Sequence, residues 1–215
     1  MKNANNSLIE AAKAGDEELI KTLLLKPQCN PRGADSRGIT ALMWAAKNGH
    51  ASCVQLLLPM SEALAKDNDS WSALMYAARS GEASCLKLLL PVSDALVKDG
   101  WGWTALMFAA INGKMSCVQL LLPVSDALAK SRTGETSLMR AASNGHAPCV
   151  QLLLPVSDAL AKNLQGETAS ALATIRGYPE LGRLIDTYAL SMSELSVLQS
   201  FTLPATAGKP RLLRV

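Results

Sequence analysis

The chain has 215 residues and is 49% hydrophobic but only 4% aromatic, so Leu and Ala supply most of its apolar surface. This composition favours many small helix–helix contacts over a large aromatic core. A net charge of +3 is too small to indicate a nucleic-acid or anionic-membrane partner. The polar start MKNANNSLIE lacks the apolar run of a secretory signal, and no stretch has the ~20 apolar residues of a membrane span. A cytoplasmic location with reduced cysteines is therefore expected.

The first predicted unit, residues 6–37, contains two helices in the segment SLIEAAKAGDEELIKTLL. Leu8, Ala11 and Ala12 give the first helix one apolar face, and Gly15 separates it from the second helix. The outer face is charged, with Glu10, Lys13, Asp16, Glu17 and Lys21. Because an uncapped stack would expose its apolar contact surface, this unit is expected to serve as a polar cap.

Five further predicted units follow with a constant step of 32 residues. A constant step without insertions is the signature of stacked units, each in contact with its neighbours only. The step links columns of leucine (Leu42, Leu74, Leu106, Leu138), glycine (Gly49, Gly81, Gly113, Gly145, Gly177), cysteine (Cys53, Cys85, Cys117, Cys149) and proline (Pro59, Pro91, Pro123, Pro155). The units are 38–69, 70–101, 102–133, 134–165 and 166–190, the last being a second polar cap. Residues 191–215 are expected to form one more helix and a flexible tail.

Each unit is predicted to hold two short helices. Thr40 is a good N-cap for the first helix, and Leu42 and Ala45 lie on its apolar face. Gly49 ends this helix as a residue that tolerates positive φ. Pro59, which has no N–H to donate, ends the second helix. Helices of this length are marginal alone, so stacking between units supplies the missing burial.

The stretch GITALMWAAKNGHASCVQLLL resembles an ankyrin repeat, whose pattern is T-P-L-H-x-A-A, then G-H, then an apolar helix ending in L-L. The positions that match are Thr40, Leu42, Ala45, Ala46, Gly49, His50, Leu56 and Leu57. The resemblance covers residues 6 to about 188, and the variant is similar to ankyrin-only arrays expanded in some parasitic protists. It implies an all-α ankyrin-repeat solenoid of about six helix-turn-helix units with polar capping units. It also implies that partners dock on the hairpin tips and the inner face of the first helices.

The sequence departs from the ankyrin pattern at three places. The family proline is Ala41, and the family histidine is replaced by Met43 and its equivalents Met75, Met107 and Met139. That histidine normally forms hydrogen bonds between units, so a thioether is expected to fill the place by packing. Pro-Val-Ser-Asp replaces the family Gly-Ala-Asp, and the period is one residue short. Whether the shortened connecting hairpins form as in typical repeats is left open.

No pattern indicates catalysis, a metal or a cofactor. The column cysteines are expected to be small buried residues, since stacked helices ~8–10 Å apart hold their Cα atoms too far apart for disulfides. His50 and His146 share a position that also accepts Glu, Lys and Tyr, which favours a surface turn over a catalytic base. Phosphate-loop, serine-hydrolase and zinc-protease motifs are absent. A lysine column is balanced by an acidic column four residues earlier, so no nucleic-acid partner is expected.

The columns that vary between units carry the information about recognition. The candidate partner-binding residues are Ile39, Trp71, Arg79, Trp101, Trp103, Ile111 and Asn112, at hairpins and at the ends of first helices. Clustered aromatic residues beside Arg and Asp are typical of interface hot spots, so the three tryptophans are expected to project together. The alternative is that the rings pack on one another. The two readings stay open for Trp101 and Trp103, whereas packing is preferred for Trp44, Tyr76 and Phe108.

The sequence thus predicts a non-enzymatic, monomeric module that binds a protein partner and needs no cofactor. Recognition would come from a rigid frame that holds variable side chains on a concave face. Two alternatives remain: a structural or cytoskeletal spacer, and a regulatory module for a separate enzyme. The sequence does not identify the partner.

Overall fold

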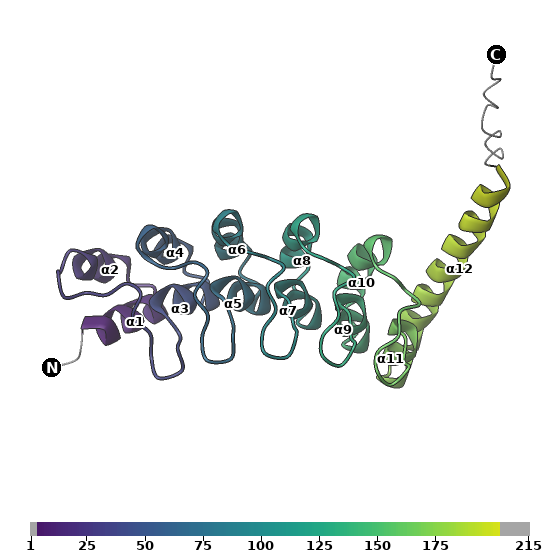
Figure 1. The fold of residues 1–215 in the computed structure, drawn as a ribbon, viewed down its shortest axis with the longest axis horizontal. Helices are drawn as coiled ribbons and strands as arrows, with labels where there is room; N and C mark the ends of the chain where they lie inside the picture. Colours follow the sequence, from purple (N-terminus) through teal and green to yellow (C-terminus); the bar gives the residue numbers. More distant parts are fainter. Residues whose placement is uncertain (1–3, 203–215) are drawn as a thin grey trace, which may run out of the picture.

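The computed structural model describes the backbone of residues 4–202 and the side chains of residues 6–194. Within that range, twelve α-helices stack as six antiparallel pairs in an elongated array (Figure 1). The first helices are α1 (Ala4–Ala14), α3 (Ala41–Lys47), α5 (Ala73–Ser80), α7 (Ala105–Ile111), α9 (Ser137–Ser143) and α11 (Ala169–Ile175). The second helices are α2 (Glu17–Leu24), α4 (Ala51–Leu57), α6 (Ala83–Leu89), α8 (Met115–Leu121), α10 (Ala147–Leu153) and α12 (Pro179–Thr202). The predicted all-α solenoid of helix pairs is therefore confirmed.

The helix ends follow from single residues, as predicted. The Thr40 side chain accepts a hydrogen bond from the Met43 N–H at 3.3 Å, and the other first helices from α5 onward have the same cap. Gly49 has φ of +79°, which an L-residue rarely adopts, and so it turns the chain between α3 and α4. Pro59 lies in a short 3₁₀-helix, Leu58–Met60, which ends the second helix of its unit. Three equivalent turns, η2 (Leu90–Val92), η3 (Leu122–Val124) and η4 (Leu154–Val156), follow later second helices.

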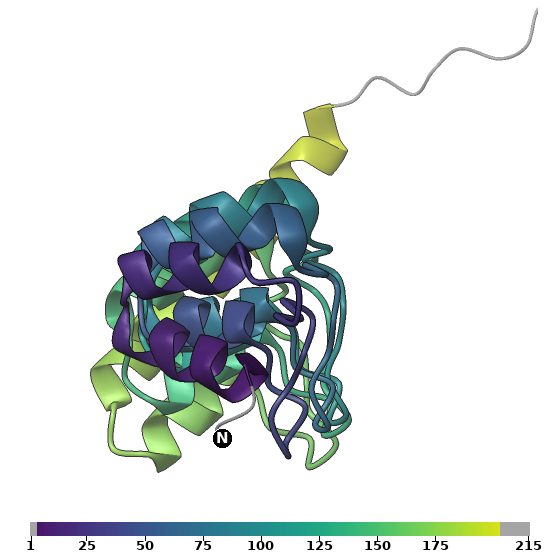
Figure 2. The same cartoon turned by 90° about the vertical axis from the view of Figure 1, so that its left-hand side faces the viewer.

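First and second helices form two layers, seen along the array in Figure 2. The core of buried residues runs the length of the array, from Leu8 to Ile185. First helices contribute leucine, alanine and methionine, and second helices contribute the cysteine column with Val or Leu. Met43, Met75 and Met107 are at most 1% exposed, so the thioethers fill the family histidine position by packing. Met43 Sδ also accepts a hydrogen bond from the Thr40 N–H at 3.5 Å. The column cysteines are buried and free, as expected, and burial raises the pKa of the Cys117 thiol to about 11.

The histidines join neighbouring units. His50 Nε2 lies 3.0 Å from the Lys13 carbonyl oxygen, and His146 Nε2 lies 3.0 Å from that of Ile111. A carbonyl only accepts, so each Nε2 carries the hydrogen. Both rings are half-buried against a glycine of the preceding unit. The expectation of a simple surface turn is therefore replaced by an inter-unit contact.

The connecting hairpins do form, and they make one continuous row on the side of the first helices (Figure 1). In each later hairpin the first and fifth residues pair through the backbone, as Asp67 N–H does with the Trp71 carbonyl at 3.0 Å. Successive hairpins are tied together as well, since the Arg132 N–H donates to the Trp101 carbonyl at 2.9 Å. The shortened connection thus keeps its variable residues in a fixed row.

The C-terminal part differs from the predicted boundary. Helix α12 is the second helix of the last pair and continues without a break through residue 190 to Thr202. Residues 203–215, which include most of the predicted tail, lie outside the described part of the chain. None of the helices in residues 4–202 combines the length and apolarity needed to cross a membrane.

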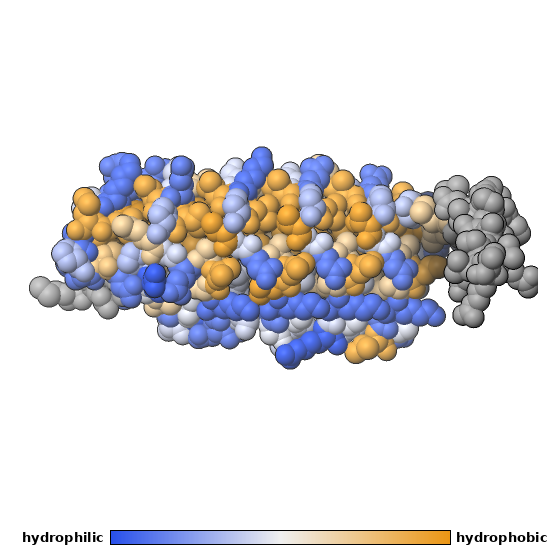
Figure 3. Space-filling model, turned by 45° about the horizontal axis from the view of Figure 1, so that its top comes forward, coloured by the Kyte–Doolittle hydropathy of each residue, from blue (hydrophilic) through white to orange (hydrophobic). Residues whose placement is uncertain are grey.

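The face that carries the second helices shows apolar groups alternating with polar ones along the array (Figure 3). Exposed leucines recur after these helices, at Leu64, Leu96, Leu128 and Leu160. Because almost the same residues recur in every unit, these positions do not distinguish one unit from the next. Differences between units lie instead in the hairpins.

Candidate protein-binding pocket at the Asp99–Trp103 hairpin

Asp99 builds the hairpin 99–103 that connects α6 to α7. Its Oδ1 accepts hydrogen bonds from the Trp101 N–H at 2.9 Å and from the Trp103 N–H at 2.8 Å. The Asp99 N–H donates to the Trp103 carbonyl at 2.9 Å, and Gly102 supplies a φ of +80°. These bonds place Trp101 at the tip of the hairpin and Trp103 at its base, two residues apart in very different surroundings.

The two tryptophans at hairpin bases, Trp71 and Trp103, are half-buried and pack against the core. Phe108 lies between them, with its ring centroid 4.3 Å from that of Trp71 and 5.2 Å from that of Trp103. Tyr76 extends the row, 5.2 Å from Trp71. The result is an interlocked aromatic row across two units, which favours the packing interpretation for both rings.

Arginines cover the outer faces of these two rings. The Arg79 guanidinium lies 5.1 Å from the Trp71 ring centroid, and that of Arg140 lies 4.2 Å from Trp103. Arg140 also pairs with Glu135, and burial lowers the pKa of its guanidinium. Base tryptophans are thus held from both sides, which leaves little of their surface for a partner.

Trp101 is different, because 69% of its surface is exposed. Its ring has no aromatic or cationic neighbour of the kind that the other tryptophans have, among the side chains of residues 6–194. Only its backbone is fixed, by the hydrogen bond to Asp99. An exposed indole on a fixed backbone is therefore the distinctive feature of this hairpin.

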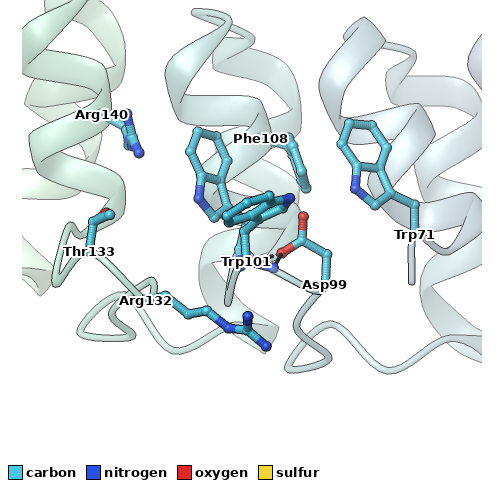
Figure 4. Close-up of a pocket in the computed structure, with 8 residues that line it drawn as sticks. Trp71, Asp99, Trp101, Phe108, Arg132, Thr133 and Arg140 are labelled. Carbon is cyan, nitrogen blue, oxygen red and sulfur yellow. Dashed lines mark hydrogen bonds between the residues drawn. The ribbon is translucent and has the colours of Figure 1, made fainter. Parts of the chain in front are cut away.

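A pocket of about 320 Å³ lies beside this indole. We call it the Trp101 pocket; it is lined by Trp71, Asp99, Trp101, Trp103, Phe108, Arg132, Thr133 and Arg140. Figure 4 shows that these side chains come from three successive units, with Trp101 at the centre and Arg132 running beneath it. Half of the lining residues are aromatic, and the others include one carboxylate and two guanidinium groups.

The Asp99 carboxylate lacks a partner that its counterparts have. In the equivalent positions, Asp35 Oδ2 accepts from Trp44 Nε1–H at 3.1 Å, and Asp67 Oδ2 accepts from the Tyr76 hydroxyl at 2.6 Å. Burial and this bond to Asp67 raise the pKa of Tyr76 well above its ordinary value. Phe108 takes the same position beside Asp99 and has no donor to offer. No donor from the described side chains therefore reaches Asp99 Oδ2, although Asp99 is only 8% exposed.

The candidate residues from the sequence do not form one exposed strip. Ile39 is 2% exposed and belongs to the core, so it is corrected from contact residue to packing residue. Trp71 and Trp103 line the Trp101 pocket but are half-buried, and only Trp101 projects. Three candidates lie away from the pocket lining: exposed Arg79, half-buried Ile111 and exposed Asn112, whose side chain donates to the Phe108 carbonyl at 2.8 Å.

Five pocket residues were missed by the sequence interpretation: Asp99, Phe108, Arg132, Thr133 and Arg140. A signal for the first two existed, because a column of aspartates precedes a column of ring donors by nine residues. That pairing is interrupted at Phe108 alone among the three units that have the aspartate. The described residues contain no group of three or more His, Cys, Asp or Glu side chains that could hold a metal ion.

A family model described as ankyrin repeats (3 copies) matches residues 8–99 and 84–164. No curated protein was found to match the chain. The family matches together span well over half of the sequence, and the helix pairs and hairpins of the structure have the order that the repeat requires. The chain therefore belongs to the ankyrin-repeat family.

Proposed function

We propose that this protein is a non-enzymatic recognition module that binds another protein through the Trp101 pocket. Ankyrin repeats are generally protein–protein interaction modules and are typically non-enzymatic. Within that general role, the array serves as a scaffold that holds one exposed ring in a defined place. The module acts as a monomer, and its place is the cytoplasm, a reducing compartment that five free cysteines fit.

The exposure of Trp101 is the observation that carries the proposal. An indole with 69% of its surface in water retains a large apolar area that a partner can cover. Trp is among the residues most enriched in interface hot spots, and this ring stands over a pocket of about 320 Å³. The backbone of the hairpin is already fixed by Asp99, so little backbone conformational entropy is lost when the ring is covered.

Selection of a random peptide library against the protein tests this function. Trp101→Thr is the decisive variant, since Thr133 occupies the same place in the next hairpin and the frame accepts it there. Selected peptides should bind Trp101→Thr about 30-fold more weakly, the loss expected for a hot-spot residue. Leu128→Ala is the matched control, because it truncates an apolar side chain that is 56% exposed at a distance from the pocket lining.

A structural spacer, or a regulatory module that contacts its enzyme elsewhere, gives a different result. In that case, selected peptides would bind wild type and Trp101→Thr alike, or would lose affinity only in Leu128→Ala. Either result would remove the Trp101 pocket as the recognition site.

A further inference from the structure

We infer, on the basis of the proposed function, that the Trp101 pocket takes a basic side chain of the partner, a lysine or an arginine. Its N–H group would donate to Asp99 Oδ2, and its positive charge would lie against the Trp101 ring. Two independent features of this pocket, an unused acceptor and an uncovered ring, point to the same kind of occupant.

The unused acceptor is the first feature. Asp99 is a carboxylate with more than nine-tenths of its surface buried, and its Oδ2 faces the pocket without a donor among the described side chains. The same oxygen is satisfied within the chain in both other hairpins that have the aspartate. Asp99 Oδ2 is accessible to solvent, since it is not among the described buried atoms that lack a hydrogen-bond partner. An occupant that covers this oxygen without supplying an N–H would leave it buried and unpaired, which is costly, whereas an occupant that supplies an N–H avoids that cost.

The uncovered ring is the second feature. Trp44 has the charged groups of Lys13, Arg37 and Lys47 within 5.3 Å of its ring centroid. Trp71 and Trp103 each have one arginine at a similar distance. Among the four tryptophans, all of them within the described part of the chain, Trp101 is the one whose ring has no cation over it. A cation from a partner would complete at Trp101 the arrangement that the chain provides elsewhere.

The charges around the pocket are compatible with a cationic occupant. Arg140 is already engaged by Trp103 and Glu135. Arg132 is exposed, forms no ion pair with Asp99, and lies beneath Trp101 in Figure 4. An acidic occupant would meet the Asp99 carboxylate in a lining that is half aromatic. A purely apolar occupant would leave Asp99 Oδ2 covered without a hydrogen-bond partner.

Phe108→Tyr tests the unused acceptor without removing any wall of the pocket. The new hydroxyl would occupy the position that Tyr76 has in the preceding unit, where it donates to Asp67 Oδ2 at 2.6 Å. With Asp99 Oδ2 occupied, a selected peptide should bind at least about tenfold more weakly, since a hydrogen bond to a charged group is lost.

Asp99→Asn tests the same acceptor by replacing the carboxylate itself. Asn163 occupies the equivalent position and still accepts from the Gln165 and Glu167 N–H groups, so the turn tolerates the amide. The Asn side chain would present an NH₂ group to the pocket in place of an acceptor. Asp99→Asn should therefore weaken the binding of a basic peptide about as much as Phe108→Tyr does.

The peptide itself supplies the third test, with peptides from the library selection as the probes. Selected sequences should share a lysine or arginine, and norleucine at that position, which removes the charge, should weaken binding at least about tenfold. For a lysine peptide, trimethyllysine keeps the charge but has no N–H, so it should bind more weakly than lysine. Arg132→Ala should leave binding unchanged or tighten it, because it removes a like charge.

The outcomes separate this inference from the proposed function. Peptides that depend on Trp101 but tolerate norleucine, Phe108→Tyr and Asp99→Asn would overturn the basic occupant and leave the recognition site intact. Trimethyllysine binding as tightly as lysine would contradict the role of Asp99. Peptides that are indifferent to Trp101→Thr would overturn the proposed function and this inference together.

Discussion

Hairpins 67–71 and 99–103 share one construction, and two differences bear on the pocket: the residue at the tip and the ring beside the aspartate. Each begins with an aspartate whose Oδ1 accepts two backbone N–H groups, and each has a half-buried tryptophan at its base. The tip is Asp69 in one and Trp101 in the other, and the neighbouring ring is Tyr76 or Phe108. The repeated residues fix the frame, and these two exchanges turn a closed hairpin into an open pocket.

Substitutions in the core, which both hairpins share, should cause the largest loss of stability. Leu121 is fully buried in α8, and Leu89 has the same place in α6. Truncation of either residue to Ala should lower the free energy of unfolding by about 2–5 kcal/mol, because it leaves a cavity between stacked units. Chemical denaturation measures this loss. A cost below about 1 kcal/mol at either leucine would contradict the shared core.

The base tryptophans should be the next most sensitive. Trp103 packs on Phe108 and is covered by Arg140, so Trp103→Ala should cost about 2–3 kcal/mol, somewhat less than a fully buried ring. Trp71→Ala should cost a similar amount, since its ring is held in the same way. Chemical denaturation of both variants measures these costs. An unchanged denaturation midpoint for Trp103→Ala would show that the Trp103 ring does not pack against the core.

Exchanging Tyr and Phe at the ring beside each aspartate should have opposite effects on stability in the two units. Tyr76→Phe leaves Asp67 Oδ2 without its donor and should cost about 1–3 kcal/mol, whereas Phe108→Tyr should be neutral or stabilising by up to about 1 kcal/mol. If both exchanges destabilise the protein equally, then Asp99 is not an unsatisfied counterpart of Asp67.

The Tyr76 contribution should also depend on pH. Burial and the Asp67 carboxylate raise the folded-state pKa of Tyr76 above its ordinary value of 10.0. A group with a raised pKa contributes stability that is complete below the ordinary pKa and is lost as the pH rises toward the folded-state pKa. The stability difference between wild type and Tyr76→Phe should therefore be constant near neutral pH and decrease above about pH 10. A difference that grows with alkaline pH would have the wrong sign.

Most of the frame could be predicted from the sequence because each feature depends on residues close in the chain. Thr40 caps a helix that begins at the next residue. Gly49 makes the turn between two helices that are its neighbours in the sequence. The buried cysteine column likewise follows from helical periodicity within one unit. The inter-unit role of His50 escaped prediction, since it depends on the carbonyl of Lys13 in another unit.

The site could be predicted only in part, because exposure depends on neighbouring units. Trp101 and Trp103 are the same residue type two positions apart, and the groups that cover Trp103 come from Phe108 and from Arg140 one unit further on. Ile39 stands in the same column as Trp103 but is small enough to be buried completely. The sequence does contain a signal for Asp99, which is the loss of a ring donor at Phe108. The unused Oδ2 itself becomes visible when the hydrogen-bond partners of the equivalent aspartates are compared.

The role of the hairpin tip is tested most directly by one variant, Trp101→Thr, measured for both binding and stability. Titration of a selected peptide should show affinity reduced by about 30-fold, as expected for a central hot spot. Denaturation should show a free energy of unfolding within about 0.5 kcal/mol of wild type, because the removed ring is largely exposed. Unchanged affinity, or a loss of stability as large as that expected for Trp103→Ala, would contradict the claim that this hairpin tip is the recognition site.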